Sequence, residues 1–350
     1  MRIVVAMSGG VDSSVAAALL AEQGHDVVGV SMQLYDNSSG FGTCCTSDDL
    51  HDARRVAARL GIPHYILNFE SHFHAHVQRN FIDEYARGRT PIPCAHCNSE
   101  VKFSQLAARA SGYGASHLAT GHYARLARGE NGGVRLLRGR DAGKDQSYFL
   151  FSLAQAQLEM ARFPVGDLPK DEVRAHAHRL GLAVADKPDS QEICFVPDGD
   201  YAAFLERAEP ALATAGTIVD GTGRTLGTHG GVHRFTVGQR KGLGLSAGVP
   251  LYVVGIDAAS QAVTVGPRAA LDRATLTASQ VNWISGDARA GWTAVTAQIR
   301  HRHRPAPARV RALDEARAEL EFDQPQTAIS PGQAVVFYDG DEVVGGGWID

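Results

Sequence analysis

The chain has 350 residues, of which 44% are hydrophobic and 21% charged, and its formal net charge is −4. That length suits two or three domains, and the composition is typical of a soluble globular protein rather than of a disordered or fibrous chain. No apolar run approaches the ~20 residues of a membrane helix, and MRIVVAMSGG lacks the pattern of a signal peptide. Five cysteines, an odd number, argue against a disulfide scaffold. We therefore expect a cytoplasmic protein without membrane contact whose thiols are reduced.

Strand and helix patterns alternate through the first 200 residues. Apolar, β-branched runs predict strands over 2–7, 25–33, 64–69 and 116–124. Periodic segments that end in glycine or carry acids in their first turn predict helices over 13–24, 47–61, 74–88 and 99–114. This alternation predicts an α/β domain with a doubly wound parallel sheet over residues 1–200.

The pattern changes after residue 200, where glycine, threonine and valine become frequent and short alternating segments follow one another. Such segments predict hairpin-linked strands. We expect a small central linker domain over 201–270 and a β-barrel over 271–350, with a sandwich as the alternative.

A basic stretch lies inside the last of these domains. AQIRHRHRPAPARVR (297–311) contains five arginines and two histidines but no acid. It either binds a phosphate backbone locally or is a solvated strand edge whose charges prevent edge pairing. The residues alone leave both interpretations open.

The string MSGGVDSS (7–14) connects the first strand to the first helix. Ligands of open α/β sheets bind at the carboxyl ends of strands, where glycines allow close approach of an anion and a helix N-terminus offers free N–H groups. The string is neither a Walker motif nor GxGxxG. It predicts a phosphate-binding loop, and the alternative is an ordinary turn with Asp12 as helix cap.

The cysteines allow a metal site or thiol chemistry. A structural zinc site needs four ligands, whereas here a single CxxC pair, Cys94 and Cys97, is accompanied by a distant Cys194. Adjacent Cys44 and Cys45 have poor chelate geometry, and we interpret them as non-catalytic. A zinc or iron–sulfur site using the other three cysteines remains an alternative.

The thiol interpretation starts from Cys97, which precedes a predicted helix whose N-terminus Asn98 and Ser99 can cap. A helix N-terminus favours the thiolate form of a nearby cysteine. Cys194 lies in the apolar segment ICFV, so it is either a second reactive thiol or an ordinary buried cysteine.

At this point a family resemblance is visible. SGGVDSS looks like the pyrophosphate-loop signature of the N-type ATP pyrophosphatases, and nearly the whole chain resembles the tRNA-specific 2-thiouridylases. The matching strings are LGIP–NF (60–69), GRTPIPCAHCN (88–98), ATGHYAR (119–125), LLRGRDAGKDQSYFL (136–150), FPVGDLPK (163–170), KPDSQEICFV (187–196), TVGQRKGLG (236–244) and SPGQAVVFY (330–338).

The resemblance implies ATP-dependent 2-thiolation of the wobble uridine of tRNA. In that family ATP adenylates the base and releases pyrophosphate, and a persulfide then delivers sulfur as AMP departs. The matching positions make Cys194 the persulfide carrier and Cys97 the nucleophile, so a Cys97–Cys194 disulfide is expected by thiolate attack on sulfur. A persulfide-donor protein and a thiol reductant are implied partners.

The resemblance also implies binding residues. For ATP they are Ala6, Met7, Ser8, Gly9, Gly10, Val11, Asp12, Ser13, Met32 and Gly121. The triphosphate implies Mg²⁺, for which Asp12 would be either a ligand or the holder of a bound water, and no structural metal is expected. For the anticodon arm of the lysine, glutamate and glutamine tRNAs they are His122, Lys144, Asp145, Gln146, Arg300, His301 and Gln333. Ile92 stands where we expect asparagine, His301 where we expect tyrosine, and aspartate replaces Cys94 in some relatives.

Two rival functions remain at this stage. An amidotransferase-type synthetase would adenylate a carbonyl and add ammonia, and it would need neither cysteine nor RNA. A non-catalytic, nucleotide-gated RNA-binding protein with a zinc-stabilised CxxC would bind metal and release no pyrophosphate.

Overall fold

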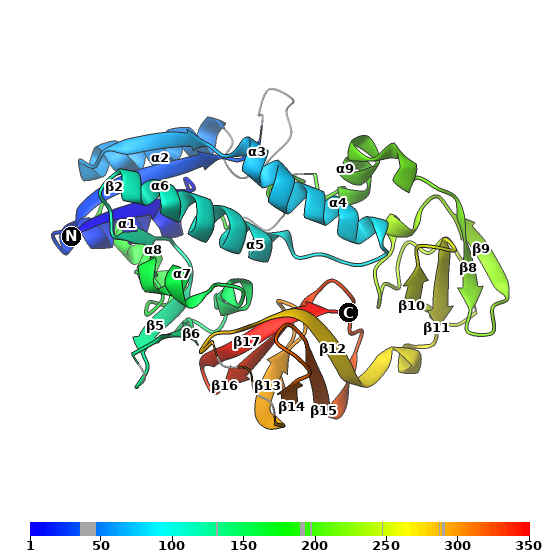
Figure 1. Cartoon of the computed structure of the whole chain (residues 1–350). Coiled ribbons are helices and arrows are strands. Elements are labelled where there is room, and N and C mark those ends of the chain that lie inside the picture. Colours follow the sequence, from blue (N-terminus) through cyan, green and yellow to red (C-terminus); the bar gives the residue numbers. More distant parts are fainter. Residues whose placement is uncertain are drawn as a thin grey trace.

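The computed structural model describes residues 1–35, 47–130, 132–189, 193–196, 198–246, 248–286, 288 and 291–350. Three parts follow one another along the chain (Figure 1): an α/β part, a small β part and a barrel that carries the C-terminus. Cys44 and Cys45 lie outside the described residues. Among the described helices, none has the length and apolarity required to span a membrane.

The helical elements are α1 (Val11–Glu22), α2 (Ser47–Leu60), α3 (Glu70–Phe73), η2 (His74–Gln78), α4 (Arg79–Ala86), α5 (Pro93–His96), η3 (Cys97–Leu106), α6 (Ala107–Gly112), η4 (Ser147–Leu150), α7 (Gln155–Met160), α8 (Lys170–Arg179), α9 (Tyr201–Ala208), η5 (Pro210–Leu212), η6 (Val232–Arg234) and η7 (Arg268–Leu271). The strands are β1 (Arg2–Ala6), β2 (Asp26–Gln33), β3 (His64–Asn68), β4 (His117–Ala119), β5 (Ala124–Arg128), β6 (Val134–Arg138), β7 (Ala161–Arg162), β8 (Gly216–Asp220), β9 (Thr225–His229), β10 (Tyr252–Asp257), β11 (Ala262–Gly266), β12 (Asp272–Trp283), β13 (Thr293–Gln298), β14 (Ala306–Ala312), β15 (Ala318–Thr327), β16 (Ala334–Asp339) and β17 (Glu342–Ile349).

The N-terminal sheet has the strand order β3-β2-β1-β4-β7, and all its pairings are parallel. Alternate residues of β1 enter different cores: Ile3 and Val5 pack in one cluster, Val4 and Ala6 in the other. A strand buried on both faces requires a continuous apolar run, which explains the sequence IVVA over 3–6 after the exposed Arg2. The predicted doubly wound sheet is confirmed.

Several predicted boundaries need correction. The strand predicted over 116–124 ends at Ala119, and Ala124 begins β5, so the residues between them form a loop at the strand end. The two helices predicted over 74–88 and 99–114 begin earlier, at Glu70 and Pro93. Each contains a π-helical segment, η2 and η3, and π-helical turns are often found at functional sites.

The central part is a four-stranded sheet in the order β10-β11-β8-β9, around a small core of its own. In the last part, β12, β15, β14, β13, β16 and β17 are neighbours in that order, and pairing of β12 with β17 closes a six-stranded barrel. The predicted barrel is therefore confirmed and the sandwich excluded. The β5–β6 hairpin of the α/β part extends this sheet, because Glu342 of β17 pairs with Leu137 of β6.

Candidate active site

The glycine-rich loop follows β1 at the carboxyl edge of the sheet and leads into α1. Gly9 has φ +74°, and a Cβ there would lie 2.1 Å from the backbone oxygen of Asp49, so only glycine fits. The hydroxyl of Ser14 donates to the Gly10 carbonyl (2.8 Å), and the Ser13 hydroxyl accepts from the Ser8 amide (3.1 Å). Gly10 is the N-cap of α1 without a side-chain cap. The alternative in which Asp12 caps this helix is therefore wrong.

Gly121 lies directly against this loop. A Cβ on Gly121 would be 2.5 Å from the Ser13 amide nitrogen and 2.6 Å from the Asp12 carbonyl carbon. Met32 is buried (7% exposed) near the carboxyl end of β2, the strand beside β1. The predicted ATP residues thus lie at the carboxyl ends of β1, β2 and β4, at one edge of the sheet.

Charged side chains form a buried network beside the loop. The Lys170 ammonium donates to Asp12 Oδ1 (2.6 Å) and contacts Asp189 Oδ1 (2.8 Å), while the Tyr123 hydroxyl donates to the same Asp12 oxygen (2.7 Å). The second oxygen of Asp189 accepts from Lys144 (2.7 Å). Burial alone would raise the pKa of Asp189, but hydrogen bonds from Lys144 and Lys170 outweigh it and lower that pKa. The network connects Lys144, a predicted RNA residue, to Asp12 of the loop.

A second lysine fixes the loop from another side. The Lys187 ammonium donates to the Gly9 carbonyl (3.1 Å) and to the carboxylates of Asp49 and Asp52 (2.6 Å each). Burial would lower the pKa of Lys187, but these hydrogen bonds outweigh it and raise that pKa. The Gly9 carbonyl is thereby held by a cation that Asp49 and Asp52 neutralise.

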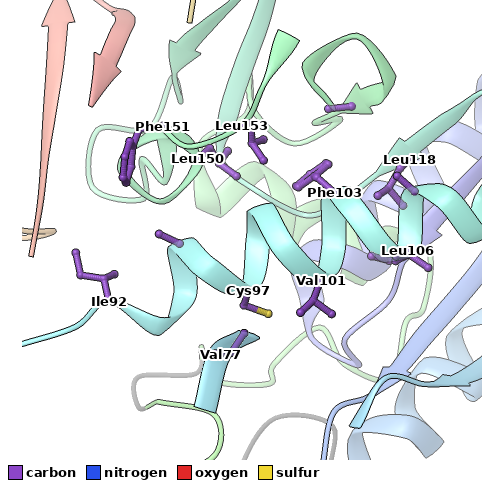
Figure 2. Close-up of a cluster of buried hydrophobic side chains, with 14 of the residues drawn as sticks. Val77, Ile92, Cys97, Val101, Phe103, Leu106, Leu118, Leu150, Phe151 and Leu153 are labelled. Carbon is purple, nitrogen blue, oxygen red and sulfur yellow. The ribbon is translucent and has the colours of Figure 1, made fainter. Parts of the chain in front are cut away.

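Cys97 is the first residue of η3 and is buried (8% exposed), whereas Cys94 on α5 is exposed. Figure 2 shows the Cys97 side chain on the same side of its helix as Val101 and next to Val77. The helix already begins at Pro93, so Asn98 and Ser99 lie within it and the predicted capping role is wrong. Ser99 instead donates back to the Ala95 carbonyl (3.3 Å).

Cys194 is half-buried and packs against the same hydrophobic cluster that contains Cys97. Its carbonyl oxygen accepts from the Tyr35 hydroxyl (3.0 Å). The next residue, Phe195, packs edge-on against Phe73 and Phe81, with ring centroids 5.6 and 5.2 Å apart. Two cysteines that are 97 residues apart in sequence are thus brought to one cluster.

Polar side chains lie on the helix that contains Cys97 and next to Gly121. Asn98 is buried; its amide donates to the Phe149 carbonyl and its oxygen accepts from Lys102, both at 3.0 Å. His122, next to Gly121, pairs with the Thr120 hydroxyl (2.7 Å). Burial first, and then the positive charge of Lys102, holds the pKa of His122 well below its usual value. A neutral imidazole therefore lies between the cysteine helix and the loop.

The predicted RNA string Lys144–Gln146 is held mostly by internal contacts. Asp145 accepts hydrogen bonds from the Arg138 guanidinium (2.8 Å), the Gly139 amide (2.9 Å) and the Ser147 hydroxyl (3.0 Å). The Gln146 side-chain oxygen accepts from the Tyr123 amide (3.1 Å). These two side chains shape the turn and support Lys144.

The predicted RNA residues of the barrel lie close to the cysteine segment. Arg300 is exposed and donates to the Thr327 carbonyl (3.2 Å). The exposed His301 packs its ring against Phe149 (4.6 Å between centroids), and the Gln333 amide donates to the Thr90 carbonyl (2.9 Å). Gln333 and His301 thus contact Thr90 and Phe149, and Phe149 accepts a hydrogen bond from Asn98 next to Cys97.

A further contact fixes the CxxC segment to the barrel. His96, between Cys94 and Cys97, stacks on Trp348 of β17 with ring centroids 4.3 Å apart and an interplanar angle of 3°. Burial lowers the pKa of His96 to about 4. Ile92 is buried in the cluster, so its side chain belongs to the core at this end of the helix.

A cysteine metal site finds no support in the described part of the chain, where no group of three or more His, Cys, Asp or Glu side chains is placed to hold an ion. Sequence reasoning missed Tyr123, Lys170, Lys187 and Asp189. The strings FPVGDLPK and KPDSQ could have indicated the two lysines, because Lys170 directly follows a proline and Lys187 directly precedes one.

Family models match all three parts of the chain. A model described as "tRNA methyl transferase HUP domain" matches residues 1–198, one described as "tRNA methyl transferase PRC-barrel domain" matches 202–267, and one described as "Aminomethyltransferase beta-barrel domain" matches 273–349. A solved complex of a 4-thiouridine synthetase with RNA and bound ATP has a TM-score of 0.37 and 19% identity, covering 60% of this chain and 50% of that one. That similarity is too low to bear on function.

Full-length relatives are much more similar. The tRNA-specific 2-thiouridylase MnmA of Geobacter metallireducens is 55% identical, with 100% of this chain and 96% of the relative covered. The MnmA of Geotalea uraniireducens is 53% identical, with 100% and 95% covered. With this identity over the whole length, the chain belongs to the tRNA-specific 2-thiouridylase family.

Proposed function

We propose that the protein uses ATP to replace the carbon-2 oxygen of the wobble uridine of tRNA with sulfur. The observation that carries the proposal is the packing of Cys97 and Cys194 against one cluster, in a chain whose glycine-rich loop is contacted by Gly121. The proposed division of labour is catalysis by residues 1–200 and RNA binding by residues 271–350, with 201–270 between them. The proposed substrates are the lysine, glutamate and glutamine tRNAs, in the cytoplasm.

The loop and its surroundings suit the triphosphate of ATP. The backbone of Ala6–Ser13 has no side chain at Gly9, and the N-terminus of α1 offers free N–H groups to an anion. The Lys170 ammonium, buried between Asp12 and Asp189, supplies positive charge beside this loop. Asp12 offers the carboxylate that would hold Mg²⁺, which neutralises phosphate charge when bound.

The chemistry balances in two steps. First, the carbon-2 oxygen of the uridine attacks the α-phosphorus of ATP and pyrophosphate leaves, so the oxygen becomes part of a good leaving group. Next, the outer sulfur of a Cys194 persulfide attacks carbon 2, and AMP departs with the oxygen. Cys97 thiolate then attacks the Cys194 sulfur, which forms a Cys97–Cys194 disulfide and leaves the second sulfur on the base.

An alternative order has the same products. Cys97 attacks the inner sulfur of the persulfide first, releasing hydrosulfide that then attacks carbon 2. Both orders end in the disulfide, so two electrons from a thiol reductant restore the enzyme, and a persulfide-bearing protein reloads Cys194. Asn98, which pairs with Lys102, directly follows Cys97, and the half-buried His122 directly follows Gly121, which contacts the loop; we propose that these groups hold the base.

The test is thiolation of unmodified tRNA with ATP and a persulfide source, followed by mass spectrometry of the nucleosides. We expect 2-thiouridine from wild type and from Cys94→Ser, whose thiol is exposed, and none from Cys97→Ser or Cys194→Ser. Cys94→Ser is the matched control because it lies on the same helical run.

The other outcomes discriminate between functions. If all three variants are inactive and the protein carries stoichiometric metal, the cysteines form a metal site and the two-cysteine mechanism is wrong. If wild type makes no 2-thiouridine with any persulfide source but releases pyrophosphate with ammonia and another acceptor, the synthetase alternative replaces this proposal.

A further inference from the structure

A cavity of about 450 Å³ lies where the three parts of the chain meet. Thr90 reaches it from the segment before α5, Thr236, Tyr252 and Arg268 from the central part, and Arg300 and Gln333 from the barrel. Its volume falls within the ~300–1,000 Å³ of typical ligand sites. The central part supplies five of the thirteen described lining residues, between Thr236 and Arg268.

The chemistry of the lining selects an anionic, planar ligand. Arg268 and Arg300 are exposed guanidinium groups, and Tyr252 offers a half-buried aromatic ring. Among the described residues that line the cavity, none is acidic. A second cavity of similar volume differs in this respect. Its lining contains three arginines, Arg125, Arg138 and Arg140, and also three carboxylates, Asp145, Asp167 and Asp341.

The surrounding charge extends beyond one small molecule. The loop that supplies Thr236 continues to exposed Arg240 and Lys241, and the strand end that supplies Arg300 continues to exposed Arg302 and Arg304. These exposed cations, which follow lining residues closely in sequence, suit a polyanion more than a free nucleotide.

We propose that this cavity binds one nucleotide of the RNA substrate, with its phosphate at Arg268 and Arg300 and its base against Tyr252. The proposal rests on the proposed function, and it adds a nucleotide subsite to which the central part contributes Thr236, Tyr252 and Arg268. Single-stranded RNA is bound in this way by combining phosphate contacts with stacking on aromatic rings.

The cavity is connected to the cysteine segment through Thr90. The Thr90 hydroxyl donates to the Thr236 hydroxyl (3.1 Å), its amide donates to the Pro331 carbonyl (2.8 Å) and its carbonyl accepts from Gln333 (2.9 Å). The central part and the barrel are in close contact at this cavity, since a Cβ on Gly238 would lie 2.7 Å from the Cβ of Ala328. A nucleotide bound here therefore contacts residues that fix the chain three positions before α5 begins.

The test measures binding of a fluorescent anticodon-arm hairpin to the full chain over a range of salt concentrations. For Arg268→Ala we expect a Kd about fivefold to tenfold higher and a salt slope smaller by about 0.7, the value for one single-strand phosphate contact. For Tyr252→Leu we expect a Kd about fivefold higher and an unchanged slope, because stacking is lost but no charge. Arg273→Ala, an exposed arginine of β12 outside the cavity lining, is the charge-matched control and should stay within twofold of wild type.

Ultraviolet crosslinking identifies the ligand directly. We expect wild type to give a Tyr252 peptide joined to one nucleotide of the hairpin. The proposal is overturned if Arg268→Ala and Tyr252→Leu match Arg273→Ala in Kd and slope, or if the hairpin crosslinks to peptides outside the cavity lining and not to Tyr252. Wild-type 2-thiouridine formation is measured in the same preparation, so that failure of the thiolation chemistry is recognised separately from failure of this subsite.

Discussion

The stack of His96 on Trp348 predicts a specific loss of stability in mild acid. An unfolded histidine has a pKa of about 6.5, whereas burial lowers the pKa of His96 to about 4 in the folded protein. Between these two values the unfolded chain binds a proton that the folded chain does not, so stability is complete above pH 6.5 and falls as the pH decreases. At 1.36 kcal/mol per pH unit, the loss is about 2 kcal/mol at pH 5 and about 3 kcal/mol at pH 4.

The perturbation that isolates this contribution is His96→Phe, which keeps an aromatic ring on Trp348 but cannot be protonated. Urea unfolding of wild type and of the variant at pH 8, 6 and 5 gives two free energies at each pH. We expect their difference to change by about 2 kcal/mol in favour of the variant between pH 8 and pH 5. His74→Phe, at an exposed histidine of η2, is the control and should follow wild type.

The result that would refute this reasoning is a His96→Phe variant whose stability falls with pH as steeply as that of wild type. A titration of the His96 ring by NMR, identified by the resonance missing from the variant, gives an independent measurement. A ring that titrates near pH 6.5 would show that His96 is solvated and that the stack on Trp348 does not exist in solution.

Three further predictions concern the site. Lys170→Met should lower tRNA-dependent pyrophosphate release by about 100-fold, because one buried cation at a developing charge is worth about that much; a variant with near-normal release would contradict its role at the loop. Gly121→Ala should raise the KM for ATP at least about tenfold, since its Cβ would meet loop backbone at 2.5 Å, whereas Gly112→Ala, which meets nothing within 4 Å, should leave that KM unchanged. Asn98→Ala should cost about 1–3 kcal/mol of stability through two lost buried hydrogen bonds and lower the thiolation rate; denaturant unfolding at wild-type values would refute this.

Local patterns predicted the elements of the sheet and missed the partners of its charges. The run IVVA (3–6) predicts a strand buried on both faces because all four of its residues are apolar, and the structure buries all four. The Lys170 ammonium pairs with Asp12, 158 residues away in sequence. Nothing in the sequence around either residue specifies that pairing, since it depends on where α8 packs relative to α1.

The start of the cysteine helix could have been placed better from sequence. Proline is favoured at the first position of a helix because its missing N–H would be unpaired there, and Pro93 occupies that position. The prediction instead gave weight to Asn98 and Ser99 as caps. The structure buries both and uses Asn98 to hold the Phe149 carbonyl, a contact that only the tertiary fold creates.

The contacts around Cys97 connect the barrel to the part of the chain for which catalysis is proposed. Three residues close to Cys97 are fixed by groups outside the N-terminal sheet: Thr90 by Gln333, His96 by Trp348, and Asn98 by Phe149, on which His301 packs. Gln333 and His301 are also proposed RNA contacts, so a bound tRNA would touch the groups that orient the cysteine helix. Under the proposed mechanism, the Cys97 thiol would reach its reactive geometry only when RNA is bound, and this would limit wasteful consumption of the persulfide. It follows that shortening His301 or Gln333 to alanine should slow sulfur transfer more than it weakens RNA binding, and equal losses in both would mean that the barrel only binds.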